Sequence, residues 1–355
     1  MVPSGVRALT ENGHQVLTQK SAGEGAGISD TEYADAGAEI IPTAEDVYTA
    51  ADMIVKVKEP QPSEYDLLKP DQLLFTYLHL APAPELTKGL LNQGIIGIAY
   101  ETVQLDNGTL PLLTPMSEIA GKLSVQIAAH YLKKENGGSG VLLGGIPGVK
   151  PGHVVILGGG TVGQNAAKIA LGMGAQVTLL DISLERLRYL DDVMEGKLIL
   201  LASNMDNIEN AINTADVVVG AVLVPGAKAK KLVTPNMISE MRKGSVMVDV
   251  AIDQGGCFET SKTTYFDDPI FFVDGIIHYC VANMPGCVAQ TSTFALTNAT
   301  FPYILKIANS GYKNALYDDI PLQKGLNIYK GKLTNKPVAE AVGIKYIPYE
   351  SAIRN

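Results

Sequence analysis

The sequence contains no tryptophan, and aromatic residues make up only 6% of it. Its three cysteines are Cys257, Cys280 and Cys287. An odd number of cysteines without the spacing of zinc ligands argues against a disulfide framework and against a metal site. The cysteine usage therefore favours reduced thiols in the cytosol, and we expect no metal.

Clustered positive charge and long apolar stretches are also lacking. The formal net charge is −9 and no cluster of Lys and Arg stands out, so nucleic acid and anionic lipid surfaces are poor partners. The longest apolar run, residues 217 to 224, falls far short of the roughly 20 residues that span a bilayer, and the start MVPSGVRAL has no apolar signal core. We therefore expect a soluble, cytoplasmic protein that binds small molecules and no membrane.

The chain is long and rich in glycine. At 355 residues it exceeds the size at which one hydrophobic core keeps growing, so two domains are expected. Hydrophobic residues make up 46% of the chain, and there are 36 glycines. This composition suits an α/β protein with many tight turns between strands and helices.

The stretch VVILGGGTVGQ, residues 154 to 164, organises the chain. A short apolar run leads into Gly158, Gly160 and Gly163 in G-x-G-x-x-G spacing, and a helical pattern follows. In such a junction the first glycine permits a tight turn, the second lets a pyrophosphate approach the backbone, and the third lets helix and strand pack closely. Asp181 ends the next apolar strand, where its carboxylate can accept the ribose hydroxyls. This order predicts a dinucleotide site, and the alternative is a glycine-rich turn with a solvated aspartate.

Before this motif, strand and helix patterns alternate as in a parallel sheet covered on both faces. Ser4 is expected to cap a helix over residues 5 to 12. The loop SAGEGAGI, residues 21 to 28, is interpreted as a turn because no Lys follows its glycines. The expected strands of this first domain are 15 to 18, 39 to 41, 53 to 57, 73 to 78 and 95 to 100, with helices over 31 to 36, 44 to 50 and 85 to 92.

A helix over residues 117 to 134 is expected to connect the two domains, and a helix over 294 to 308 to return the chain to the first. The last 45 or so residues show no strand series. The fold class is thus α/β, with two Rossmann-like doubly wound parallel-sheet domains around an inter-domain cleft. Further strands of the second domain are expected at 176 to 180, 197 to 201, 217 to 222, 246 to 252 and 276 to 281.

Polar residues follow four of these strands, at the end where open parallel sheets bind ligands. Lys58 and His79 belong to the first domain, and Asp253 and Asn283 to the second. A cleft between the domains would bring a cation, an imidazole and a carboxylate together over a bound nicotinamide. The alternative is that each is a solvated residue at a strand end. The remaining histidines lack such a placement and are interpreted as structural: His14, His130, His153 and His278.

The chain closely resembles the alanine dehydrogenase family from Pro3 almost to its C-terminus. The NAD-binding portion of proton-translocating transhydrogenase is the relative most easily confused with it, but that assembly implies membrane segments. The resemblance rests on the long segments VKVKEP (55 to 60), LLFTYLHLA (73 to 81), YETVQ (100 to 104), LPLLTPMSEIAG (110 to 121), GVLLGGIPGVKPG (140 to 152), GAVLVPGAKA (220 to 229), VDVAIDQGGCFE (248 to 259) and VANMPG (281 to 286).

The resemblance implies an NAD-dependent oxidoreductase that reversibly deaminates L-alanine to pyruvate and ammonia, usually as a homohexamer. It implies a discontinuous substrate domain over 1–111 and 290–355 and an NAD-binding domain over 112–289. His79 matches the family's catalytic histidine, Asp253 its catalytic aspartate and Lys58 a lysine that contacts the substrate. Besides the three glycines and Asp181, the positions that match residues lining NAD are Ser117, Thr161, Val162, Arg186, Ser203, Val222, Leu223, Val250, Ala251, Ile252, Asp253, Lys262, Val281, Ala282, Asn283 and Met284.

The start of the chain departs from the family pattern. Family members begin with a further strand and turn, of the form GVPKE, before the proline that matches Pro3. That segment brings the family's substrate-binding arginine, which pairs with the carboxylate of alanine or pyruvate. The expectation is either a true start further upstream or a shortened protein. The alternative function is therefore a non-catalytic or weakly active NAD-binding protein.

Overall fold

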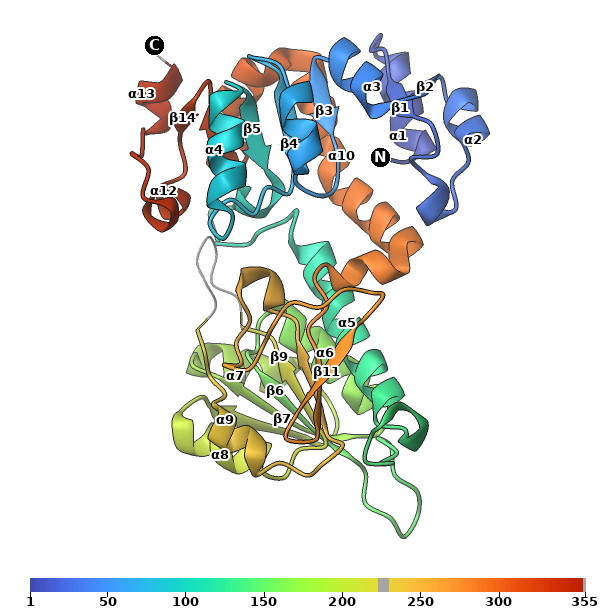
Figure 1. Ribbon diagram of the computed structural model, residues 1–355, viewed down its shortest axis with the longest axis vertical. Coiled ribbons are helices and arrows are strands. Elements are labelled where there is room, and N and C mark those ends of the chain that lie inside the picture. The colour runs from blue at the N-terminus through green and yellow to red at the C-terminus, as the bar shows by residue number, and fades with distance from the viewer. Residues whose placement is uncertain (223–229, 354–355) are drawn as a thin grey trace. The chain divides into compact units, whose positions relative to one another are not determined.

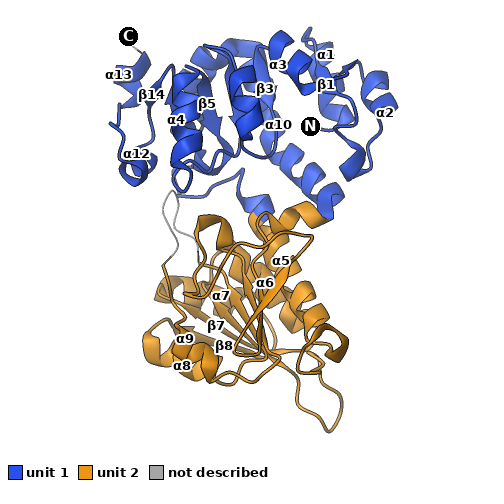
Figure 2. Cartoon of the chain, in the orientation of Figure 1, with its two compact units in different colours: residues 1–116, 225–227, 288–355 blue, residues 117–224, 228–287 orange. Residues whose placement is uncertain are grey.

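The computed structural model describes residues 1–222 and 230–353. These residues form two units, each built around its own sheet (Figure 2). Unit 1 comprises residues 1–116 and 288–353, and unit 2 comprises residues 117–222 and 230–287. The chain therefore leaves unit 1, forms unit 2 and then returns to unit 1.

Unit 2 is built around a sheet that includes β6, β7 and β9 (Figure 1). The sheet has seven strands in the order β11-β12-β10-β9-β6-β7-β8. Neighbouring strands are parallel except β11 and β12. Because β6 has β7 on one side and β9 on the other, the strand order reverses beside β6, and doubly wound sheets bind ligands at such a point. The strands are β6 His153–Leu157, β7 Gln176–Asp181, β8 Leu198–Ala202, β9 Val217–Gly220, β10 Val246–Asp249, β11 Ile270–Val273 and β12 Ile276–Tyr279.

The central strands of unit 2 are runs of Val, Ile, Leu and Met whose side chains are fully buried, as expected for strands covered on both faces. Helix α5 packs closely on α6, because a Cβ added to Gly121 would lie 2.3 Å from the carbonyl oxygen of Val162. The helices are α5 Thr114–Tyr131, α6 Thr161–Gly172, α7 Leu184–Val193, α8 Met205–Ile212 and α9 Pro235–Ser239, with the 3-10 turns η4 Lys134–Asn136, η5 Ile252–Gln254 and η6 Met284–Val288.

Unit 1 contains a five-stranded sheet with the order β14-β13-β5-β4-β3 and a separate pair of parallel strands, β1 and β2. Strands β3, β4 and β5 are parallel, whereas β13 runs antiparallel to both β5 and β14. The bounds are β1 Leu17–Gln19, β2 Glu39–Ile41, β3 Met53–Val55, β4 Leu73–Thr76, β5 Ile96–Ala99, β13 Leu326–Tyr329 and β14 Lys332–Leu333.

The longest helix of unit 1, α10, packs against α1 and η1 and is interrupted at Gly311, where φ is 73° and ψ is 151°. It begins at Ala289, as the chain re-enters unit 1. The helices are α1 Pro3–Glu11, α2 Asp30–Asp35, α3 Ala44–Ala50, α4 Pro84–Asn92, α10 Ala289–Asp318, α11 Ile320–Lys324, α12 Lys336–Val342 and α13 Tyr349–Ile353, with the turns η1 Glu24–Ala26, η2 Pro62–Leu67 and η3 Tyr100–Thr102.

A cavity of about 710 Å³ lies within unit 1. Residues 14–19, which include β1, and residues 50–57, which include β3, contribute to its lining together with part of α10. Among the described residues β1 pairs with β2 and β3 pairs with β4. Each of the two strands therefore has one edge that no other described strand covers.

The bounds of β2 and α3 are those predicted, but two expectations for the chain ends are wrong. Helix α1 begins at Pro3, and its N-cap residue Val2 makes no side-chain capping bond, so Ser4 is not the cap. Proline suits this first helical position because its missing N–H would have no partner there. The C-terminal residues do contain strands, β13 and β14. Lys330 and Gly331 join these strands with φ of 48° and 79°, the left-handed values of a two-residue hairpin turn.

Strand β11, which forms the antiparallel edge of the sheet in unit 2, was not expected from the sequence. A second two-residue turn, Asp274 and Gly275, joins β11 to β12 with φ of 50° and 81°. Within residues 1–222 and 230–353, no helix is both long enough and apolar enough to cross a membrane.

Candidate functional site

Lys58 and His79 follow neighbouring parallel strands of unit 1. Strand β3 ends at Val55 and β4 at Thr76, so both residues lie three positions beyond a strand end rather than directly at it. The hydroxyl of Thr76 donates a 3.1 Å hydrogen bond to the carbonyl oxygen of Lys58, which joins the two loops. Because β3 and β4 are parallel, both loops leave the same edge of the sheet.

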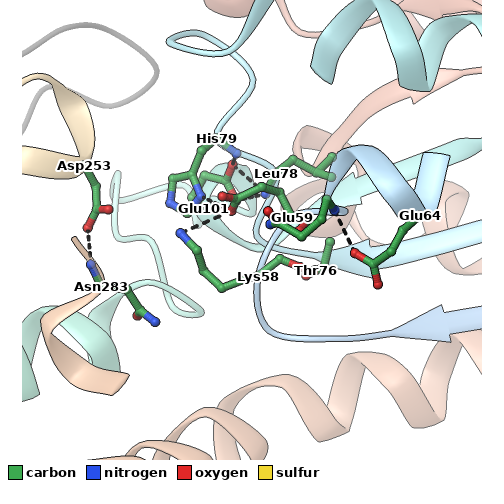
Figure 3. A network of polar contacts seen from close by, with 10 residues as sticks. Lys58, Glu59, Glu64, Thr76, Leu78, His79, Glu101, Asp253 and Asn283 are labelled. Carbon is green, nitrogen blue, oxygen red and sulfur yellow. Dashed lines mark hydrogen bonds and ion pairs between the residues drawn. The ribbon is translucent and has the colours of Figure 1, made fainter. Parts of the chain in front are cut away.

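The backbone of His79 is held by a carboxylate that the sequence analysis does not predict. His79 has a φ of 47°, which is uncommon for a residue other than glycine. Glu101 accepts hydrogen bonds from the backbone N–H of His79 at 2.7 Å and of Leu78 at 3.1 Å (Figure 3). The ring of Tyr77 stacks on the imidazole with 5.7 Å between centroids, and its hydroxyl donates to the carbonyl oxygen of Leu112 at 2.6 Å. The histidine is therefore fixed at its backbone and supported on one ring face.

A second acid, Glu59, joins His79 to Lys58. Its Oε2 atom lies 3.2 Å from Nδ1 of His79 and 3.2 Å from Nζ of Lys58 (Figure 3). Burial pushes the pKa of Glu59 upward, but the hydrogen bond from His79 and the charge of Lys58 outweigh it and lower the pKa to about 2. Glu59 is therefore a carboxylate at neutral pH. The side chains of Lys58, Glu59 and His79 are 37%, 23% and 25% exposed, so a small molecule can reach them.

Both acids carry a sequence signal. Glu59 directly follows Lys58, and Glu101 follows β5, the strand beside β4 in the sheet. The rule that singles out polar residues after parallel strands applies to Glu101 as well. Its contact with His79 spans 22 positions and depends on the order of the strands, which the sequence alone does not give.

In unit 2 the glycine motif has the geometry that its spacing predicts. Gly158 has a φ of 105°, and its N–H donates to the carbonyl oxygen of Leu180 at 2.8 Å. A Cβ added to Gly163 would lie 1.8 Å from the carbonyl oxygen of Gly158, so helix α6 packs directly on the turn. A Cβ added to Gly160, the N-cap of α6, would meet no atom within 4 Å. The open space at Gly160 lies at the N-terminus of α6, where unpaired N–H groups favour a phosphate.

Asp181 and Arg186 bind the two backbone polar groups of Gly159, its N–H and its carbonyl oxygen. Oδ2 of Asp181 accepts a hydrogen bond from the N–H of Gly159 at 2.6 Å, and Oδ1 accepts one from the N–H of Ser183 at 2.8 Å. Nε of Arg186 donates to the carbonyl oxygen of Gly159 at 2.6 Å, and its Nη2 donates to Oε1 of Gln164 at 2.9 Å. Arg186 lies five positions after Asp181 yet contacts the same loop, because α7 begins directly after β7.

Asp253 was expected to follow a strand directly, but it does not. Strand β10 ends at Asp249, and Asp253 lies in the one-turn helix η5. Its Oδ2 atom accepts a hydrogen bond from the N–H of Asn283 at 3.3 Å, which links the loops after β10 and β12 (Figure 3). Asn283 has a φ of 57°. The structure thus brings together two of the residues predicted to line the nicotinamide.

The buried carboxylate of Asp249 organises the loop that carries Asp253. It accepts hydrogen bonds from the N–H groups of Ala251 at 3.1 Å, Cys257 at 2.9 Å and Phe258 at 3.3 Å, and from the hydroxyl of Ser261 at 2.5 Å. Burial raises the pKa of Asp249, and these four donors act in the opposite direction. No sequence pattern marks this role, since an aspartate at a strand end is equally expected to be solvated.

Most of the other predicted cofactor positions follow strands of unit 2. The N–H of Ser203 donates to the carbonyl oxygen of Asp181 at 2.9 Å, and that of Val250 donates to Gly220 at 3.0 Å. Lys262 instead places Nζ 4.4 Å from the centre of the Phe271 ring. Thr161 and Val162 are the first residues of α6, and Ser117 lies in α5. Ala251 and Ile252 precede Asp253, and Asn283 is flanked by Val281, Ala282 and Met284. Val222 lies two positions beyond the end of β9, and Leu223 lies outside the described residues.

The four histidines interpreted as structural have partners within their own units. His14 contacts Asn309 at 2.7 Å, and His153 contacts the hydroxyl of Thr178 at 2.8 Å. His278 is buried and lies 2.9 Å from the hydroxyl of Thr260, and His130 packs edge-on against Tyr131. In the described part of the chain, no group of three or more His, Cys, Asp or Glu side chains is placed to hold a metal ion.

Comparisons with known proteins give a consistent match along the chain. The family model "Alanine dehydrogenase/PNT, N-terminal domain" matches residues 1–120, and "Alanine dehydrogenase/PNT, C-terminal domain" matches residues 124–336. An alanine dehydrogenase of Methanococcus maripaludis is 57% identical over 354 residues, covering 99% of this chain and 95% of that protein. An alanine dehydrogenase of Halomonas elongata is 53% identical over 353 residues, again covering 99% and 95%.

Solved structures agree with these matches. A structure of L-alanine dehydrogenase aligns with a TM-score of 0.91 and 54% identity, over 97% of this chain and 94% of that chain. A transhydrogenase structure from Sinorhizobium meliloti aligns with a TM-score of 0.77 over 94% and 93% of the two chains, but at 21% identity this likeness concerns the fold alone.

Proposed function

Because the chain belongs to the alanine dehydrogenase/PNT family, we propose that it is an NAD-dependent L-alanine dehydrogenase, which interconverts L-alanine with pyruvate and ammonia. The observation that carries the proposal is 57% identity to an alanine dehydrogenase over 99% of the chain. Such a match favours an active enzyme over the alternative of a non-catalytic NAD-binding protein. We further propose a homohexamer in the cytoplasm, as the family resemblance implies.

The division of labour between the units forms part of the proposal. Unit 1, with a boundary near residues 111 and 290, is proposed to bind the substrate through Lys58 and His79. Unit 2 is proposed to bind NAD through the glycine motif, Asp181 and the other predicted cofactor positions.

The residues of unit 2 fit a dinucleotide. Gly160 leaves space at the N-terminus of α6, where a Cβ would occupy the room that a pyrophosphate needs. The carboxylate of Asp181 ends β7 beside that loop, placed for ribose hydroxyls. NAD, when bound there, supplies the acceptor for the hydride that leaves Cα of alanine.

The side chains of unit 1 are proposed to bind and orient the substrate. The ammonium of Lys58 forms an ion pair with the carboxylate of the substrate. His79 donates a hydrogen bond to the oxygen that develops on Cα when water adds to the substrate iminium. Proton transfer by such a positioned histidine typically contributes roughly 10² to 10⁴ in rate.

Asp253 is proposed to hold the attacking water and to take its proton as the new carbon–oxygen bond forms. The loop around Asp249 and the hydrogen bond from Asn283 keep this carboxylate in place. The carbinolamine formed in this way then breaks its C–N bond: Asp253 returns the proton to the nitrogen, ammonia leaves, and the hydroxyl gives up its proton to solvent to become the carbonyl of pyruvate. In the reverse direction ammonia first adds to the carbonyl carbon, and Asp253 then returns a proton to the departing water.

The direct test is a steady-state assay with purified protein that follows NADH formation from NAD and L-alanine. NAD binding is measured separately by titration without substrate. Alanine-dependent NADH formation supports the proposal. If the protein binds NAD but shows no turnover in either reaction direction, the result contradicts the proposal and favours the alternative of a non-catalytic NAD-binding protein.

A further inference from the structure

The strongest unassigned feature of unit 1 is the position of Glu59. A single carboxylate oxygen, Oε2, contacts both Nδ1 of His79 and Nζ of Lys58, each at 3.2 Å. These are the two side chains that the proposed function gives to the substrate.

We propose that Glu59 is a positioning residue that fixes a proton on Nδ1 of His79 and tethers the ammonium of Lys58, so that the two substrate-binding groups are set as one unit. This proposal rests on the proposed function. A carboxylate that accepts a hydrogen bond at Nδ1 selects the tautomer of a neutral imidazole and stabilises the imidazolium when it forms. The substrate oxygen then meets Nε2, the nitrogen whose proton can be exchanged.

The arrangement also sets the charge of the site. With a neutral imidazole, Lys58 and Glu59 cancel, and protonation of His79 gives the three groups one net positive charge. A substrate carboxylate is then attracted most strongly when His79 carries the proton that it is to donate. Removing the charge of Glu59 separates protonation of His79 from attraction of the substrate carboxylate, even in a variant that keeps the shape of the side chain.

Two other glutamates of unit 1, Glu101 and Glu64, provide comparisons for the proposed role of Glu59. Glu101 accepts hydrogen bonds from the backbone N–H groups of His79 and Leu78, so these contacts hold the loop, whereas Glu59 contacts the imidazole itself. Glu64 forms an ion pair with Nζ of Lys56 at 2.5 Å and has a side chain exposed to 19%, similar to Glu59. The variant Glu64→Gln therefore removes a comparable charge and ion pair in the same unit, away from His79.

The test compares wild type, Glu59→Gln and Glu64→Gln by the rate at which diethylpyrocarbonate modifies His79 as a function of pH. The modified peptides are resolved by mass spectrometry, and no substrate is present. The reagent attacks the unprotonated ring. We expect the midpoint of the profile to move to lower pH by about 1 unit in Glu59→Gln, as for loss of an opposite charge at this distance, and to stay in place in Glu64→Gln.

Kinetics provide the second readout. In Glu59→Gln, kcat/KM for alanine should fall at least about tenfold with a raised KM, since Lys58 loses its tether, while the affinity for NAD stays unchanged. Glu59→Asp keeps the negative charge but places it further from His79 and Lys58. Its modification midpoint and its kcat/KM should therefore lie between those of wild type and Glu59→Gln. If Glu59→Gln does not fold, the Glu59→Asp profile carries the test.

An unmoved modification midpoint in folded Glu59→Gln, or equal shifts in Glu59→Gln and Glu64→Gln, would overturn the proposal. Because the modification profile requires no turnover, it remains decisive for Glu59 even if the wild-type protein fails to oxidise alanine, which is a failure of the proposed function alone.

Discussion

The carboxylate of Asp181 accepts a 2.6 Å hydrogen bond from the backbone N–H of Gly159, the central glycine of the phosphate loop. The same side chain that is proposed to read the ribose thus also shapes the loop that receives the pyrophosphate. Arg186 donates a hydrogen bond to the carbonyl oxygen of Gly159. Ribose recognition and loop geometry are therefore coupled, and a change at Asp181 affects both.

This relationship predicts a preference for NAD over NADP. A 2′-phosphate would approach the negative charge of Asp181, and Arg186 is already bonded to Gly159 and Gln164. We expect at least about tenfold weaker binding of NADP, since juxtaposed like charges cost several kcal/mol. Titration of both cofactors into the wild-type protein measures this ratio. Equal or tighter binding of NADP would contradict the assignment of Asp181.

Substitution of the proposed catalytic residues should separate chemistry from cofactor binding. We expect His79→Ala and Asp253→Ala each to lower alanine oxidation by at least about 10², the low end for a general acid or base. His79 belongs to unit 1, so His79→Ala should largely keep its affinity for NAD. The measurements are steady-state rates and NAD titrations on folded variants. Rates close to wild type in either variant would remove that residue from the mechanism.

Two glycines of α6 form a matched pair. In Gly163→Ala the new Cβ would lie 1.8 Å from a carbonyl oxygen of the phosphate loop, so we expect weakened NAD binding and a stability loss of about 1 to 3 kcal/mol. In Gly172→Ala the Cβ meets no atom within 4 Å, and the change should be neutral or stabilising by about 0.5 to 1 kcal/mol. Thermal melts with and without NAD distinguish the two. The same behaviour in both variants would show that close packing at Gly163 is not required.

The stability of unit 1 should depend on acid through Glu59. Its pKa is about 2 in the folded chain against an ordinary value of 4.5, so the folded state binds fewer protons than the unfolded state between these values. The stabilisation is fully present above about pH 4.5 and is lost as pH falls toward 2. Urea unfolding of wild type and Glu59→Gln across this range gives the difference. A difference that does not change with pH would mean that Glu59 is not held as a carboxylate by its partners.

The part of the fold that the sequence predicts best is the segment from β6 through α6 to β7. Its signals are local, because an apolar strand, glycines at fixed spacing and an amphipathic helix each depend on a few consecutive residues. The strand ends are less accurate. Tyr77 and Leu78 are buried and continue an apolar pattern after the ladder has ended, and burial alone does not distinguish a strand from a buried loop.

The two hairpins that were not expected from the sequence have turns of the same kind. Asp274-Gly275 and Lys330-Gly331 are two-residue turns with left-handed backbone at both positions, and Asp-Gly between apolar runs is a recognised hairpin signal. The parallel strands expected from the sequence include neither antiparallel pair, β11–β12 or β13–β14. Glu59 and Glu101 illustrate the other limit, since their contacts with His79 span 20 and 22 positions and arise only once β3, β4 and β5 are adjacent.

The cavity beside β1 and β3 gives unit 1 an uneven resistance to opening. No ladder between described strands joins the β1–β2 pair to the five-stranded sheet, so side-chain packing around a void of about 710 Å³ contributes much of what holds it there. Side chains that line a water-accessible cavity pack less densely than those of a filled core. The first 50 or so residues should therefore behave as a separate cooperative unit, with backbone amides that exchange with solvent earlier than those of β4 and β5. Lys58 and His79 follow strands of the more protected sheet, so the substrate-binding side chains keep their support while the neighbouring segment opens and closes.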